Sequence, residues 1–217
     1  MRVFTNYQKF LKEIEEVKKL VKKPSLLLHA CCTPCSCYPL LILKDYFDIT
    51  VFYNNSNIYP LSEFELRYET LNNYIINLNK EYNLDIKLIK CDYENDKFNR
   101  LLEKRKDDKE GSTRCFMCYS LRYKQLVEYA SSHNFDYVCS VMTISRQKNE
   151  EMINKILEGY CSKYKNIKYL YSNFKKDGGL EKAQKIVKEK NFYSQNYCGC
   201  KFSIRKEDKF NENFLEK

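Results

Sequence analysis

The sequence lacks any long apolar run. No stretch approaches the roughly 18 uninterrupted apolar residues that indicate a membrane-spanning helix, so we expect no membrane span. The N-terminal region also lacks the apolar core of a signal peptide. We therefore expect a cytoplasmic protein that does not associate with a membrane.

Phosphate-binding loops are absent as well. The sequence contains no G-x-x-x-x-G-K-[ST], no G-x-G-x-x-G and no S-G-G-x-D-S. The first predicted strand-to-helix turn, where a related nucleotide-binding fold would hold ATP phosphates, carries cysteines instead. Nucleotide activation at this turn is therefore not expected.

The composition is that of a globular protein with a basic surface. The chain has 217 residues, 43% hydrophobic and 31% charged, and a formal charge of +9. This length suits one large domain, or one domain with a small appendage. The excess of positive charge favours a polyanionic partner such as nucleic acid. The alternative is a lysine-rich surface that is simply solvated.

Helical and strand patterns alternate along the chain. Residues 1–24 predict an amphipathic helix lying on the domain, with Phe10, Ile14, Val17 and Val21 on its apolar face. Residues 25–217 predict a single α/β domain. Its expected strands are 25–30, 48–54, 84–92, 137–145 and 167–174, and its main expected helices are 38–46, 61–82, 96–106, 115–134, 150–164 and 180–190.

This alternation predicts a parallel sheet with helices on both faces. Ligands of such folds bind beyond the carboxyl ends of the strands. The segments CCTPC, YNNSNIYP, CDYE and TISRQK follow four of the expected strands. The remaining cysteine motifs can fold over the same edge of the sheet.

Eleven cysteines are the most informative feature. Disulfides are disfavoured in a reducing cytosol, so clustered cysteines there indicate metal ligands or redox catalysts. Cys31, Cys32 and Cys35 form C-C-x-x-C, and Cys115 and Cys118 form C-x-x-C at the start of another helix. Two such turns could supply four or five thiolates to an iron–sulfur cluster. Structural zinc is the alternative, although adjacent cysteines are unusual in a zinc knuckle.

Cys198 and Cys200 flank a single glycine. A disulfide across one residue closes a tight ring, which requires a flexible residue between the two cysteines. Such bonds tend to be labile, so the pair is a candidate for cycling between dithiol and disulfide. The alternative is that both cysteines are additional metal ligands.

Several polar residues near the expected strand ends are further candidates. Asp92 could add a hard oxygen ligand to a metal, or cap the turn that follows it. The candidate contacts to a polar or phosphate-bearing substrate are Asn54, Asn57, Tyr59, Arg122 and Lys148. Each of these is weak evidence alone, because asparagine-rich segments are also ordinary turns.

Six segments, in order, resemble the signature blocks of the QueH-type epoxyqueuosine reductases. They span about residues 25 to 203 and read LLLHACCTPCSCYPL, FYNNSNIYP, CDYE, RCFMCYSLR, TISRQK and QNYCGCKFS. The resemblance implies a fold similar to the nucleotide-alpha-hydrolase (HUP) class. It also implies cobalamin-independent reduction of epoxyqueuosine in tRNA to queuosine, the last step of queuosine biosynthesis.

The resemblance also assigns roles to the cysteines. It implies a [4Fe-4S] cluster on Cys31, Cys32, Cys115 and Cys118, and a redox-active disulfide between Cys198 and Cys200. An additional iron is implied beside the cluster, with Cys35 and Asp92 as candidate ligands. The anticodon stem-loop of tRNA would be one partner, and an electron donor of unknown identity the other.

Three other functions fit parts of the sequence. An iron–sulfur tRNA thiolase would need an ATP-binding loop that is not found. A zinc-stabilised RNA-binding module would be colourless, with one zinc ion per chain. A thiol–disulfide oxidoreductase acting on proteins would be expected to carry C-x-x-C in a thioredoxin-like pattern, which is also missing.

Overall fold

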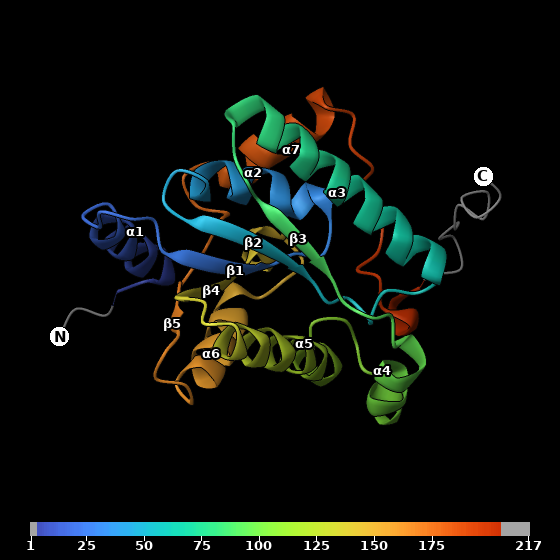
Figure 1. The fold of residues 1–217 in the computed structure, drawn as a ribbon. Coiled ribbons are helices and arrows are strands. Elements are labelled where there is room, and N and C mark those ends of the chain that lie inside the picture. The colour runs from blue at the N-terminus through green and yellow to red at the C-terminus, as the bar shows by residue number, and fades with distance from the viewer. Residues whose placement is uncertain (1–3, 205–217) are drawn as a thin grey trace.

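A computed structural model describes residues 4–204 as a five-stranded parallel sheet with helices on both faces (Figure 1). The sheet order is β3-β2-β1-β4-β5. The predicted fold class is confirmed. The strands are β1 (Ser25–His29), β2 (Asp48–Tyr53), β3 (Lys87–Lys90), β4 (Tyr137–Ser140) and β5 (Lys168–Tyr169).

The central strand β1 explains why the sheet needs two covering layers. Leu26, Leu27 and Leu28 are all fully buried, although successive side chains of a strand point to opposite faces. Leu26 and Leu28 belong to one apolar cluster and Leu27 to the other. An uninterrupted apolar run of this kind is typical of a parallel strand covered on both sides.

The helices divide between these two clusters. One cluster takes buried side chains from α1 (Asn6–Val17), α2 (Thr33–Leu43), α3 (Leu61–Tyr82) and α7 (Gly179–Glu189). The other takes them from α4 (Asn95–Leu102), α5 (Thr113–Ser132) and α6 (Glu150–Cys161). In Figure 1, α2, α3 and α7 lie above the sheet, and α5 and α6 lie below it.

Helix α1 confirms part of the N-terminal prediction. Thr5 and Gln8 form a capping box, which satisfies backbone N–H groups at the helix start. Phe10, Ile14 and Val17 are buried, as the apolar pattern predicts. The extension of this face to Val21 was wrong: the helix ends at Val17, and Val21 is fully exposed. Residues 1–3 and 205–217 lie outside the described part of the chain.

Several other element boundaries differ from prediction. The strand predicted over 137–145 ends at Ser140 and turns into a 3₁₀ helix, Val141–Ile144. The strand predicted over 167–174 reduces to two residues, because β5 pairs with β4 only over Lys168–Tyr169. Helix α2 begins at Thr33 rather than at residue 38, with Pro34 in its first turn, where proline costs no hydrogen bond.

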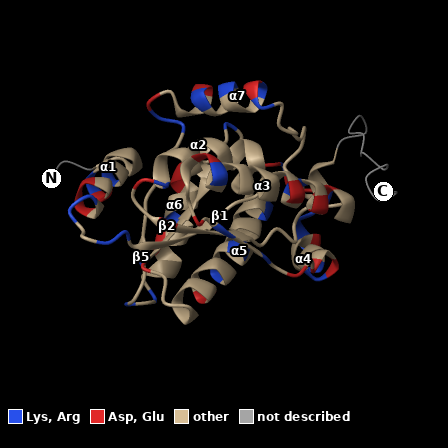
Figure 2. Cartoon of the chain, turned by 45° about the horizontal axis from the view of Figure 1, so that its top comes forward, with Lys and Arg blue, Asp and Glu red and all other residues tan. Residues whose placement is uncertain are grey.

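Charges of both signs are mixed on the outer helices. Lysine or arginine segments alternate with aspartate or glutamate segments along α1, α4 and α7 (Figure 2). Among residues 4–204, no helix combines the length and apolar character needed to cross a membrane.

The strand order creates a switch point between β1 and β4. From β1 the chain runs outward through β2 to β3, and β4 and β5 are added on the other side. Connections that leave neighbouring strands in opposite directions open a crevice beyond the carboxyl ends of those strands, where ligands of such folds bind. The segments that follow β1 and β4 contain Cys31 and Lys148, respectively.

Candidate active site

Three thiols meet at the junction between β1 and α2. The sulfur atoms of Cys31, Cys32 and Cys35 all lie within 4.8 Å of one another, and we call these residues the thiol triad. Cys31 and Cys32 are buried, with 3.7 Å between their sulfur atoms. Cys32 is the N-cap of α2, and Cys35 lies in the first turn of that helix. The short strand-to-helix turn thus brings together thiols that are close in sequence.

The triad favours a thiolate on Cys31. Hydrogen bonds from Cys32 and Cys35 hold the pKa of the Cys31 thiol well below its ordinary value. The hydrogen bond between Cys32 and Cys31, together with burial, raises the pKa of Cys32 to about 12. Hydrogen bonds to Cys31 and Cys32 raise the pKa of Cys35. Three clustered thiols with one readily ionised member are suited to a thiophilic metal.

Cys115 and Cys118 approach from the start of α5. They belong to the same buried cluster of side chains as Cys31 and Cys32. The Gly111 amide donates to Cys115 Sγ at 3.2 Å. Burial raises the pKa of both thiols, and the nearby Cys198 adds to the effect. The structure thus brings both sequence motifs to one region, although within residues 4–204 the compact group of metal-ligand atoms contains the triad alone.

Cys198 and Cys200 are free thiols that contact each other. The intervening Gly199 has φ +101°, a conformation that side-chain-bearing residues rarely adopt. A hydrogen bond from Cys200, assisted by the charge of Lys148, holds the pKa of Cys198 well below its ordinary value, and the same bond raises the pKa of Cys200. The lowered pKa of Cys198 and the raised pKa of Cys200 favour a thiolate on Cys198 beside a thiol on Cys200, an arrangement suited to thiol–disulfide chemistry.

A cavity of about 280 Å³ joins these groups. Among the predicted site residues, it is lined by Cys31, Cys35, Lys148 and Cys198. Burial lowers the pKa of Lys148, but Tyr119 and the thiols of Cys31, Cys198 and Cys35 outweigh it, so the net pKa is raised. Lys148 therefore remains a cation beside these thiols, where its charge stabilises thiolates.

Two predicted substrate contacts make hydrogen bonds within the protein. Asn54 Nδ2 donates to the Arg122 carbonyl oxygen at 2.8 Å. The Arg122 guanidinium donates to Asn55 Oδ1 at 3.1 Å, and Asn55 Nδ2 donates to the Ala30 carbonyl oxygen at 2.8 Å. This chain of contacts links α5 to the residue that precedes Cys31. It therefore fixes the position of the triad relative to α5.

The remaining predicted residues lie away from the cavity wall. Asn57 is buried, and its Oδ1 has no hydrogen-bond partner within residues 4–204. Tyr59 lines a separate surface pocket with Tyr93 and Arg100. Asp92 follows the edge strand β3 and is not part of the compact ligand group among the described residues; its backbone oxygen accepts a hydrogen bond from Ser56.

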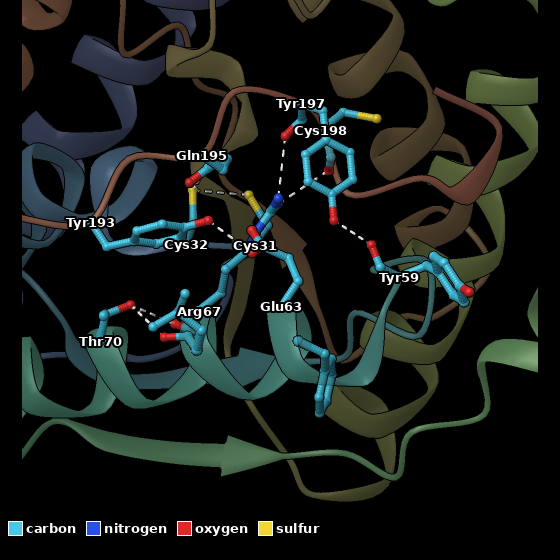
Figure 3. A network of polar contacts seen from close by, with 12 residues as sticks. Cys31, Cys32, Tyr59, Glu63, Arg67, Thr70, Tyr193, Gln195, Tyr197 and Cys198 are labelled. Atoms are coloured by element: carbon cyan, nitrogen blue, oxygen red, sulfur yellow. Dashed lines mark hydrogen bonds and ion pairs between the residues drawn. The ribbon is translucent and has the colours of Figure 1, made fainter. Parts of the chain in front are cut away.

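Sequence reasoning missed three polar residues of the site. Arg67 and Glu63 form a buried ion pair on α3, and Gln195 Nε2 donates to Cys32 Sγ at 3.0 Å (Figure 3). Arg67 and Gln195 line the cavity. The carbonyl groups that Arg67 binds and the sulfur atom that Gln195 contacts are distant in the chain, so the local pattern carried no signal. Gln195 was noticeable only as part of the segment that leads to Cys198.

Comparison with known proteins identifies one family. The model of the family "Epoxyqueuosine reductase QueH" matches residues 26–206. Three proteins named epoxyqueuosine reductase QueH are similar to this chain. That of Staphylococcus epidermidis is 34% identical, covering 93% of this chain and 86% of the relative. That of Staphylococcus aureus is 35% identical (91% and 83%), and that of Streptococcus pyogenes 32% (92% and 78%).

The triad predicts thiolate coordination of a metal. We expect Co²⁺, used as a spectroscopic probe, to give sulfur-to-metal charge-transfer absorption with the metal-free protein. Removing a residue that only hydrogen-bonds a metal ligand lowers metal affinity by about 10–100-fold. Cys31→Ser removes a predicted ligand itself, so it should weaken Co²⁺ binding by at least that factor. Cys139→Ser changes a buried cysteine of β4 and should leave the titration unchanged. Equal Co²⁺ affinity in the two variants would exclude coordination by Cys31.

Proposed function

Because the chain belongs to the QueH family of epoxyqueuosine reductases, we propose that it reduces epoxyqueuosine in tRNA to queuosine, without cobalamin. The observation that carries this proposal is the meeting of Cys31 and Cys35 of the thiol triad with Cys198 and Lys148 around one cavity. Cys200 contacts Cys198. A tRNA substrate implies a cytoplasmic site of action. The basic composition is consistent with a nucleic-acid partner.

The proposed reaction balances with one dithiol per turnover. Removing the epoxide oxygen to leave an alkene and water consumes two electrons and two protons. Formation of the Cys198–Cys200 disulfide from one thiolate and one thiol releases two electrons and one proton, and the second proton is taken from solvent. The lowered pKa of Cys198 and the raised pKa of Cys200 support a pair in which one sulfur is already ionised and its neighbour still holds a proton. An external electron donor must then reduce the disulfide.

We propose that a [4Fe-4S] cluster is held by Cys31, Cys32, Cys115 and Cys118. The soft sulfur donors, their burial and their start-of-helix positions fit such a cluster. When bound, it would carry the electrons one at a time. The proximity of the Cys35 thiol to Cys31 and Cys32 supports its assignment to an additional iron beside the cluster. The assignment of Asp92 to the same iron is supported by its position just after the carboxyl end of β3.

The chain's own polar groups then hold and orient the substrate. Lys148 lines the cavity as a cation and could contact an anionic or polar group of the nucleotide. Tyr59, which is partly exposed, could stack on a base in the neighbouring surface pocket. Asn57 is the remaining candidate, because its buried Oδ1 accepts no hydrogen bond from the described part of the chain. Asn54 and Arg122 would act by holding the triad in place.

The activity can be tested with tRNA carrying epoxyqueuosine. Protein reconstituted anaerobically with iron and sulfide, and supplied with dithionite, should produce queuosine, recognised by mass as the nucleoside lighter by one oxygen atom. A parallel sample loaded with zinc should leave the epoxide intact. The proposed function is wrong if iron-loaded protein leaves epoxyqueuosine unchanged, or if the zinc-loaded sample reduces it equally well.

The role of the dithiol can be tested separately. With a dithiol reductant, turnover by the Cys200→Ser variant should stop once the electrons already stored in the protein are used, because this variant cannot form the disulfide. Dithionite, which can bypass the pair, should restore turnover. Cys161→Ser, which alters a buried cysteine at the end of α6, is the matched control. Sustained turnover of Cys200→Ser with the dithiol reductant would refute the role assigned to the pair.

A further inference from the structure

The segment that carries Cys198 and Cys200 is attached to α3 by a buried ion pair. Arg67 and Glu63 lie one helical turn apart, with 2.6 Å between Nε and Oε1. Their side chains are only 1% and 5% exposed. Figure 3 shows that both reach from α3 toward the C-terminal segment and the thiols.

Arg67 uses its remaining nitrogen atoms on that segment. Nη2 donates to the Tyr197 carbonyl oxygen at 3.2 Å, and Nη1 donates to the Cys198 carbonyl oxygen at 3.3 Å. The Tyr197 ring also lies 5.2 Å from the guanidinium carbon. The planar, forked guanidinium thus binds two successive carbonyl groups directly before Gly199.

Glu63 and other groups continue the attachment on both sides. The second carboxylate oxygen of Glu63 accepts a hydrogen bond from the Tyr193 hydroxyl at 2.8 Å. The Tyr59 amide donates to the Gly199 carbonyl oxygen at 2.8 Å. Together with the contact from Gln195 to Cys32, these bonds hold residues 193–199 against the thiol triad.

Stability alone is a poor explanation for this arrangement. Burying two charges carries a large desolvation cost, and apolar replacements of buried ion pairs are often neutral or stabilising. An apolar side chain could fill the space of Arg67 but could not bind the two carbonyl groups. The specific gain from the ion pair is therefore the position of the turn at residues 197–199.

We propose that Arg67, oriented by Glu63, is a positioning residue that fixes the Cys198–Cys200 pair against the thiol triad. The proposal rests on the proposed function for the use of the pair in catalysis, but the attachment itself can be measured without substrate. Residues on α3 thereby control a redox pair that lies about 130 positions later in the chain.

Hydrogen exchange of the reconstituted, anaerobic protein measures the attachment directly. In Arg67→Met and Arg67→Lys, we expect the amides of Tyr59 and Cys200, which donate to the Gly199 carbonyl oxygen and to Cys198 Sγ, to exchange about tenfold faster or more, because local opening of the segment breaks these two bonds. Lysine keeps the positive charge but lacks the fork that binds both carbonyls. The control is Lys185→Met, which removes an exposed pair with Glu189 on α7 and should leave these amides unchanged.

A second variant disturbs the same turn without removing either member of the ion pair. A Cβ atom added at Gly199 would lie 2.9 Å from Ile58 Cγ1 and 3.1 Å from Arg67 Nη1, in addition to the strain of φ +101°. Gly199→Ala should therefore also accelerate exchange of the Tyr59 and Cys200 amides. If Arg67→Met fails to fold, Arg67→Lys and Gly199→Ala still decide the question.

Kinetics distinguish positioning from a general structural effect. Arg67→Lys should lower kcat with a dithiol reductant by about tenfold or more, with the KM for tRNA unchanged and dithionite-driven turnover retained. The proposal would be overturned if amide exchange in both arginine variants were as slow as in the wild type. It would also be overturned if kcat fell equally with the dithiol reductant and with dithionite. If wild-type protein is inactive on epoxyqueuosine but the variants still release residues 193–200, the proposed function fails and the attachment stands.

Discussion

The site depends on the close approach of three sulfur atoms at the end of β1. A buried parallel strand ends at His29, and α2 begins only four residues later, at Thr33. This short turn leaves the thiols of the triad within 4.8 Å of one another, and Cys31 and Cys35 line the same cavity as Lys148, which follows β4. Such thiols repel one another when more than one is ionised, so a cationic partner is the natural way to stabilise them.

The rest of the structure supports this turn with buried polar contacts. Asn55 and Arg122 connect α5 to the Ala30 carbonyl, and the Glu63–Arg67 pair attaches the C-terminal segment from the other side. The sheet itself is held by apolar burial, which has little directional preference. Charged hydrogen bonds do have directional geometry, and Arg67 and Arg122 place such bonds beside the cysteine segments.

The sequence was sufficient for the fold class and for the meeting of the cysteine motifs. Strand and helix patterns alternate clearly, and parallel strands place their carboxyl ends on one edge. Strand ends were less predictable, because β5 stops where its pairing with β4 stops, and pairing is not encoded locally. Arg67 was missed for a related reason: on α3 it has the appearance of an ordinary surface charge, and its carbonyl partners belong to a segment far along the chain.

X-ray diffraction at the iron absorption edge, from crystals grown anaerobically, tests the central claim most directly. The account predicts anomalous scattering from an iron–sulfur cluster at the junction of β1 with α2, in contact with Cys31, Cys32, Cys115 and Cys118. A signal there from a single zinc ion, with no iron after anaerobic reconstitution, would contradict the account and favour a zinc-stabilised RNA-binding protein.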